Sequence, residues 1–101
     1  MTTLSITNKA EPELDEQIRS RIHVMLGSWM TSLKVIEMDI EKDEERVQDR
    51  QLVRCEIRVM ETGGKWHLVS TQQQNLNGAL DGSLTRLRRS LQRHRQYRMH
   101  G

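Results

Sequence analysis

Residues 75–98 read NLNGALDGSLTRLRRSLQRHRQYR, and this stretch decides the fold of the chain. Its five leucines recur at spacings of four, four, three and four residues, which indicates one face of an α-helix: Leu76, Leu80, Leu84, Leu87 and Leu91. An α-helix turns by about 100° per residue. The side opposite the leucines therefore carries Arg86, Arg89, Arg93 and Tyr97. We predict a long helix with a leucine face toward a core and an arginine ridge (Arg86, Arg89 and Arg93) toward solvent.

The positive charge of this helix is not balanced locally. Residues 82–101 contain six arginines and two histidines but no acidic residue. The formal net charge of the chain is +2, yet residues 1–45 carry five basic against ten acidic residues, and residues 46–101 carry eleven against four. Such a distribution indicates an oriented encounter with a polyanion. The alternative is a solvated helix whose arginines only confer solubility, although solvated faces usually mix both signs.

The composition indicates one soluble domain spanning residues 1–101. The chain has 35% apolar residues, no Phe and six Met, so methionine is expected to fill much of a modest core. The lone Cys55 is expected to be a buried, inert thiol in a reducing compartment. No apolar run reaches the length of a signal peptide core or a membrane span. We therefore expect a cytoplasmic protein without membrane contact.

Hydrophobic periodicity predicts six regular elements. Alternating apolar residues indicate strands, a 3.6-residue period indicates helices, and glycines or unpatterned charges indicate turns and loops. The expected order is strand 4–8, helix 12–30, strand 36–41, exposed loop 42–49, strand 53–59, hairpin turn 62–64, strand 65–71 and the long helix, with Asn75 as its N-cap. The pattern leaves open which face of the fourth strand points inward, that of Trp66 and Leu68 or that of His67 and Val69.

The element order β-α-β-β-β-α predicts an α+β domain of two layers. A four-stranded mixed sheet is expected to carry both helices on one face. This is an arrangement like that of double-stranded-RNA-binding domains.

The sequence offers little catalytic or metal-binding chemistry. The four histidines (His23, His67, His94 and His100) are far apart in sequence and belong to no ligand motif, so we expect structural or surface roles and neither metal nor cofactor. No nucleophile elbow or P-loop is present. The acidic clusters at residues 37–41 and 43–45 are interpreted as solvated surface. We therefore predict a protein that is not an enzyme and has no small-molecule substrate.

Surface recognition remains as the predicted role of the last helix. Arginines at i, i+3 and i+7 suit bidentate contacts to successive backbone phosphates. Arg88 and Arg95 flank the leucines and are expected along the helix–sheet margin, as further RNA contacts. Tyr97 is a candidate for stacking on an unpaired base, or else a plain surface or core-edge tyrosine. Gly78 and Gly82 are placed on the arginine side, either for close approach of a partner backbone or as tolerated drift.

The last helix resembles that of the ribosome hibernation-promoting factors, also called ribosome-associated inhibitors, which typically reads D-M-Y-x-A-I-D-x-x-x-D-K-L-E-R-Q-L-x-K. Ala79-Leu80-Asp81 stands at A-I-D, Arg86-Leu87 at K-L, Arg89 at R, Leu91 at the second L and Arg93 at the closing Lys. The opening strand and the hairpin of the third strand are also similar. Departures occur at Asn75, Asn77 and Arg88, which the family usually fills with an acidic residue, Tyr and Glu.

The resemblance implies a factor that binds the small ribosomal subunit. It would contact ribosomal RNA, block the channel used by mRNA and tRNA, and silence translation under stress. We expect the free protein to be a monomer. Two alternatives stay open: a binder of double-stranded or structured RNA, and a protein-interaction module docking an acidic partner. The ribosomal state bound, the inducing stress and the effect on ribosome pairing are not determined by the sequence.

Overall fold

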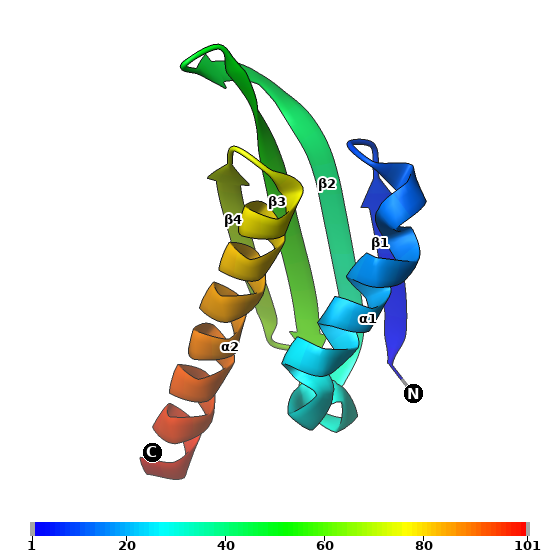
Figure 1. The fold of residues 1–101 in the computed structure, drawn as a ribbon. Helices are drawn as coiled ribbons and strands as arrows, with labels where there is room; N and C mark the ends of the chain where they lie inside the picture. The colour runs from blue at the N-terminus through cyan, green and yellow to red at the C-terminus, as the bar shows by residue number, and fades with distance from the viewer. Residues whose placement is uncertain (1, 101) are drawn as a thin grey trace.

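The structure, a computed structural model, describes residues 2–100, without the side chains of Glu45 and of residues 97–100. The elements follow in the order β1 (Thr3–Asn8), η1 (Pro12–Leu14), α1 (Asp15–Leu26), η2 (Gly27–Ser32), β2 (Leu33–Val47), β3 (Arg50–Glu61), β4 (Trp66–Gln73) and α2 (Leu76–His100). The sheet order is β1-β2-β3-β4. Both helices cover the same face of this sheet (Figure 1). The two-layer α+β fold predicted from the sequence is confirmed.

The sheet is mixed because β1 and β2 are joined by a helix. Strand β1 pairs with β2 in parallel, and α1 makes the crossover that a parallel connection requires. The β2–β3 and β3–β4 pairs are antiparallel and are joined by short turns. Strands β1 and β4 therefore form the two edges, and α2 lies over the β3–β4 side of the sheet (Figure 1).

The core lies between the helices and the sheet. All five leucines of α2 are at most 5% exposed, as the 3.6-residue period predicted. They meet apolar side chains that alternate along β2 and β3 and recur along α1: Ile36, Met38, Ile40, Val53, Cys55, Ile57, Val59, Ile18, Ile22 and Leu26. Alternation places every second strand residue against the helices, so this pattern also fixes which face of β2 and β3 is covered.

The predicted loop at residues 42–49 is wrong. Strands β2 and β3 continue through this segment as a long hairpin that extends past the helices (Figure 1). A two-residue turn closes it at Gln48 and Asp49, whose φ angles of 53° and 62° are those of a type I′ turn. Backbone pairing forms the strands here, with a register irregularity between Lys42 and Arg46. Because both faces of the hairpin end are exposed to solvent, its sequence shows no hydrophobic alternation.

The predicted first helix, residues 12–30, is divided into three parts. A 3₁₀ turn at Pro12–Leu14 precedes the α-helix, and a second 3₁₀ segment, Gly27–Ser32, follows it. The predicted apolar face is nonetheless present, since Trp29 in the second 3₁₀ segment is only 5% exposed. The tighter 3₁₀ geometry keeps this indole directed toward the core after the α-helix has ended.

Strand β4 directs His67 inward, which answers the question left open by the sequence. His67 is buried and Val69 is half-buried, whereas Trp66 and Leu68 are 50% and 64% exposed on the uncovered face. The core tolerates a buried histidine here because both ring nitrogens of His67 have hydrogen-bond partners, Ser90 Oγ and Glu61 Oε2.

The acidic face predicted for β2 is neutralised by its neighbour. Arg54 pairs with Glu41, and Arg58 lies 3.5 Å from Glu37 and 3.4 Å from Asp39. These side chains are about half exposed, so solvent screens each pair and it contributes little stability. The uncovered face of the sheet is therefore a mixed-charge surface and not an acidic one.

The start of α2 confirms the predicted N-cap and corrects the predicted position of the glycines. The Gly78 backbone N–H donates to Asn75 Oδ1 at 2.7 Å. Both glycines face strand β4, not solvent: a Cβ on Gly82 would lie 3.0 Å from Thr71 Cγ2, and one on Gly78 would lie 3.3 Å from Gln73 Cβ. The glycines thus allow the helix to approach β4 closely.

No helix in the described part of the chain combines the length and the apolar character needed to cross a membrane.

Candidate nucleic-acid interface

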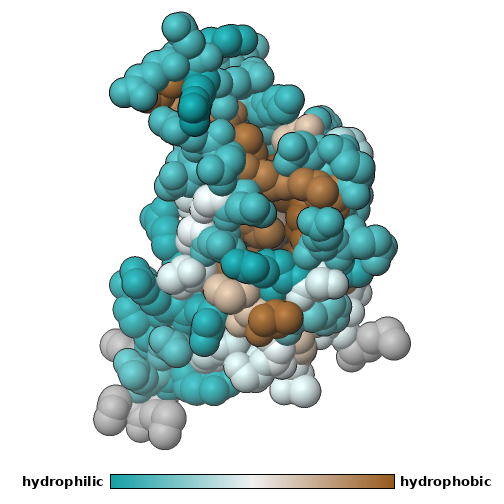
Figure 2. Space-filling model, viewed as in Figure 1, coloured by the Kyte–Doolittle hydropathy of each residue, from teal (hydrophilic) through white to brown (hydrophobic). Residues whose placement is uncertain are grey.

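The arginine ridge lies beside the edge strand β4. Arg86, Arg89 and Arg93 are exposed and line an open groove of about 500 Å³ between α2 and β4. The groove is completed by Leu68, Val69, Ser90, Gln92 and Gln96. The surface along the C-terminal part of α2 is hydrophilic in the view of Figure 2. The structure thus brings together the three arginines that the helical period placed on one side.

One guanidinium of the ridge is anchored to the sheet. Arg86 Nη1 donates to the Ser70 carbonyl oxygen at 3.0 Å. Ser70 lies on an edge strand, so the contact occupies a carbonyl at the border of the sheet. Among the side chains that the structure describes, none of the three ridge arginines forms an ion pair with a carboxylate. The positive charge of the groove is therefore available to an external anion.

The ridge has dimensions suited to several phosphates. Seven residues of α-helix rise by about 10 Å, which separates Arg86 from Arg93 along the helix axis. Each guanidinium presents a planar fork of donors that matches a phosphate bidentately. A groove of this kind can hold a sugar–phosphate backbone along the helix axis.

The other three predicted contact residues do not join the ridge. Arg95 places its Cζ 4.0 Å from the centroid of the Trp29 ring, a cation–π contact within the protein. Arg88 is exposed and lies two helical turns before Arg95, on the same side of α2. Asp81 lies on this side as well and pairs with Arg21 of α1 at 2.6 Å. The side chain of Tyr97 lies outside the described residues.

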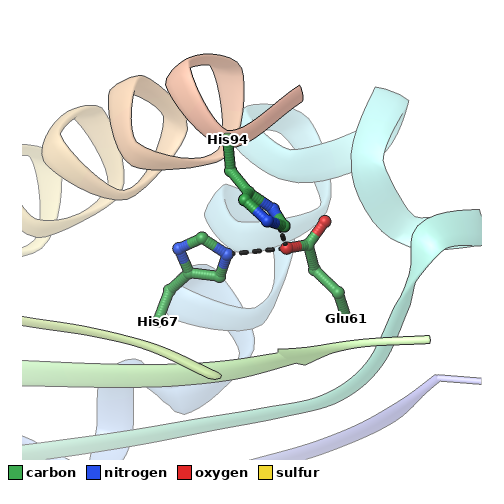
Figure 3. Close-up of side chains that lie close together, drawn as sticks. All are labelled: Glu61, His67 and His94. Atoms are coloured by element: carbon green, nitrogen blue, oxygen red, sulfur yellow. Dashed lines mark hydrogen bonds and ion pairs between the residues drawn. The ribbon is translucent and has the colours of Figure 1, made fainter. Parts of the chain in front are cut away.

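A cluster of three side chains was missed by the interpretation of the histidines as scattered. Glu61 Oε2 lies 2.8 Å from His67 Nε2 and 2.6 Å from His94 Nδ1, and the two rings meet edge to face (Figure 3). The residues come from β3, β4 and α2 respectively. Burial raises the pKa of the Glu61 carboxyl, but the hydrogen bond from His67 and the proximity of His94 outweigh it and hold that pKa below its ordinary value.

The comparisons with known proteins concern the fold. No protein-family model matches the sequence, and no curated protein matches it either. Among solved structures, a ribosomal subunit interface protein from Coxiella burnetii matches with a TM-score of 0.72 at 10% sequence identity. The two chains share one fold. The match covers 94% of this chain and 97% of the other.

Proposed function

We propose that this protein is a non-enzymatic, ribosome-associated factor of the cytoplasm that binds ribosomal RNA of the small subunit through the arginine ridge. The observation that carries the proposal is the arginine-lined groove on a fold shared with a ribosomal subunit interface protein. By occupying the channel of mRNA and tRNA, the bound protein would silence translation. The resemblance of the last helix to hibernation factors supports the same role.

The charge of the ridge supports this assignment. Phosphate contacts supply most of the sequence-independent affinity for nucleic acid, and such contacts come mainly from Arg and Lys. The ridge arginines are exposed and have no carboxylate partner among the described side chains, so binding a phosphate breaks none of the observed ion pairs. Arg88 and Arg95 lie on the other flank of α2 and would contact a different part of the RNA.

The decisive variant is the triple replacement Arg86→Gln, Arg89→Gln, Arg93→Gln. Removing each charge-assisted hydrogen bond costs about 1.5–3 kcal/mol. The affinity for purified small subunits should therefore fall by several kcal/mol, and the slope of log K against log salt should become shallower by about two to three units. Co-sedimentation of the full chain with small subunits over a range of salt concentrations measures both quantities.

The matched control removes the same charge elsewhere. The triple replacement Arg19→Gln, Arg46→Gln, Arg50→Gln changes three exposed arginines on α1 and at the hairpin end, and lowers the net charge equally. We expect this variant to bind nearly as the wild type does. An equal decrease in the affinity of both variants for small subunits would mean that net charge alone attracts the protein to RNA. Wild-type binding by the ridge variant would refute the ridge as the contact surface.

The alternative functions predict different partners in the same assay. A general binder of structured RNA would bind any long RNA duplex as tightly as small subunits, and a protein-interaction module would bind neither. An in vitro translation reaction tests the silencing step, because channel occupancy predicts inhibition that depends on the ridge. Tight subunit binding without inhibition would refute channel blocking while leaving association intact.

A further inference from the structure

The cluster of Glu61, His67 and His94 has the chemistry of a metal site. Two imidazole nitrogens and one carboxylate oxygen form the donor set, and all three atoms lie within 4.8 Å of one another. Zinc and other divalent first-row ions bind this combination, with three protein ligands leaving one position for water. We propose that Glu61, His67 and His94 bind a single divalent transition-metal ion of the zinc class. This proposal does not depend on ribosome binding.

Both nitrogen–oxygen distances are close to those that a metal requires. Zinc binds imidazole nitrogen and carboxylate oxygen at about 2.0–2.2 Å, which places tetrahedral ligand atoms about 3.3 Å apart. The Glu61 oxygen now lies 2.8 Å and 2.6 Å from the two nitrogens. The nitrogens would therefore withdraw by about 0.5–0.7 Å to admit an ion. Side-chain torsions supply such a change without moving the backbone.

One nitrogen of the cluster lacks a proper hydrogen bond. His94 Nδ1 is buried and only 2.6 Å from Glu61 Oε2, but the contact does not have hydrogen-bond geometry, and no other hydrogen-bond partner for this atom exists among the described residues. A buried ring nitrogen without an aligned partner carries a desolvation cost. Coordination of a metal ion would remove that cost, because the ion would accept the lone pair of this nitrogen.

A supporting hydrogen bond for the second imidazole is already present. His67 Nδ1 lies 2.9 Å from Ser90 Oγ. When Nε2 binds a metal, the ring proton must sit on Nδ1, and a hydroxyl oxygen at this distance accepts it. Ser90 and His94 are one helical turn apart on α2, so the same stretch of helix supplies one ligand and orients the other.

The scaffold holds the three ligands on regular elements. Glu61 ends β3, and its backbone is fixed by hydrogen bonds from Glu61 N to Lys65 O and from Gly64 N to Glu61 O, each 2.8 Å. The His67 side chain is only 5% exposed, whereas those of His94 and Glu61 are 24% and 13% exposed. The backbone of the site is thus held in place, and the partial exposure of His94 and Glu61 gives an ion a path of entry. A bound ion would connect the β3–β4 hairpin to α2.

The first experiment is isothermal titration calorimetry of the chelator-treated full chain with zinc sulfate. We expect saturable binding of one ion per chain. His67→Ala, His94→Ala and Glu61→Gln should each abolish it, and Ser90→Ala should weaken it by about 10–100-fold. His23→Ala is the matched control, because His23 is exposed on α1, and should bind as the wild type does. Absence of saturable binding to the wild type, or unchanged binding by either histidine variant, would overturn the proposal.

A second measurement needs no substitution and so does not depend on the folding of the variants. Zinc titration of the wild-type protein should shift the imidazole nitrogen resonances of His67 Nε2 and His94 Nδ1 in NMR spectra, while those of His23 stay unchanged. Cobalt at the same site should give the visible absorption of a four-coordinate ion. Zinc binding that leaves both nitrogen resonances in place would assign the ion to another site and overturn the proposal.

Discussion

Replacement of Leu87 by Ala tests the packing on which the whole fold depends. Leu87 is fully buried, is the fourth of the five leucines of α2, and belongs to a core cluster that also contains side chains of the sheet and α1. The substitution removes three carbon atoms and leaves a cavity, because neighbours held by regular elements relax only partly. The cavity would lie between the two layers of the domain and weaken the packing of α2 on the sheet.

The expected cost follows from this burial. A fully buried Leu→Ala change costs about 2–5 kcal/mol, and a site enclosed by sheet and helices belongs in the upper part of that range. A domain of this size has about 5–15 kcal/mol of total stability, so the change would remove much of it. At about 4–8 °C per kcal/mol, a decrease of about 4 kcal/mol lowers Tm by about 16–32 °C.

Urea denaturation followed by circular dichroism gives the free energy of unfolding. The midpoint should fall with an unchanged slope if the native fold persists. Gln92→Ala is the matched control, because Gln92 is exposed on the same helix, and its effect should stay within about 0.5 kcal/mol. A wild-type midpoint for Leu87→Ala would refute the placement of this face against the core.

Three further predictions concern local features. Burial raises the pKa of the Cys55 thiol and shields its sulfur, so native protein should resist a thiol reagent and react promptly after unfolding in urea; rapid native labelling would contradict the inward facing of β3. Asn75→Ala should cost about 0.5–2 kcal/mol by removing the N-cap, and Asn75→Asp should restore it. Gly82→Ala should not give the stability gain of about 1 kcal/mol expected from helix propensity, because the new Cβ would lie 3.0 Å from Thr71 Cγ2. The gain should appear when Thr71→Ser removes that methyl group. Equal changes in the free energy of unfolding in both backgrounds would exclude the contact.

The elements that the sequence predicted well are those with one solvent-exposed and one buried face. The leucines of α2 and the alternating residues of β2 and β3 are buried as their periods require. Sheet pairing follows from the element order, since a helix between β1 and β2 favours a parallel crossover and short turns favour antiparallel neighbours. The arginine ridge was predictable for the same reason, because its members share one side of a regular helix.

The errors lie where periodicity carries no information. The end of the β2–β3 hairpin is solvated on both faces, so its charged residues show no alternation, and its turn residues Gln48 and Asp49 are not the usual Asn-Gly or Asp-Gly signal. Strand β4 carries apolar residues on both faces, which leaves its orientation undecided from sequence. The glycines were placed outward because a helical wheel cannot show that an edge strand lies against that side of α2.

The metal-ligand cluster could not be predicted for a different reason. Its members are separated by 6 and 27 residues in the chain, and no ligand motif has that spacing. Their convergence depends on the inward facing of β4, on the register that sets His67 opposite Val59, and on the height at which α2 crosses the sheet. Each of these is a tertiary property that the local sequence leaves free.

The two proposed sites share one helix but use different sides of it. His94 points from α2 toward Glu61 and His67 at the sheet (Figure 3), whereas its neighbour Arg93 lines the groove beside β4. The triple ridge variant should therefore bind zinc as the wild type does, because it removes no ligand atom. Conversely, His67→Ala removes a buried ring from β4 and leaves all three ridge arginines in place, so small-subunit binding in the absence of metal should persist. In variants that remain folded by circular dichroism, loss of zinc binding in the ridge variant or loss of small-subunit binding in His67→Ala would show that a displacement of the C-terminal half of α2 couples the two sites.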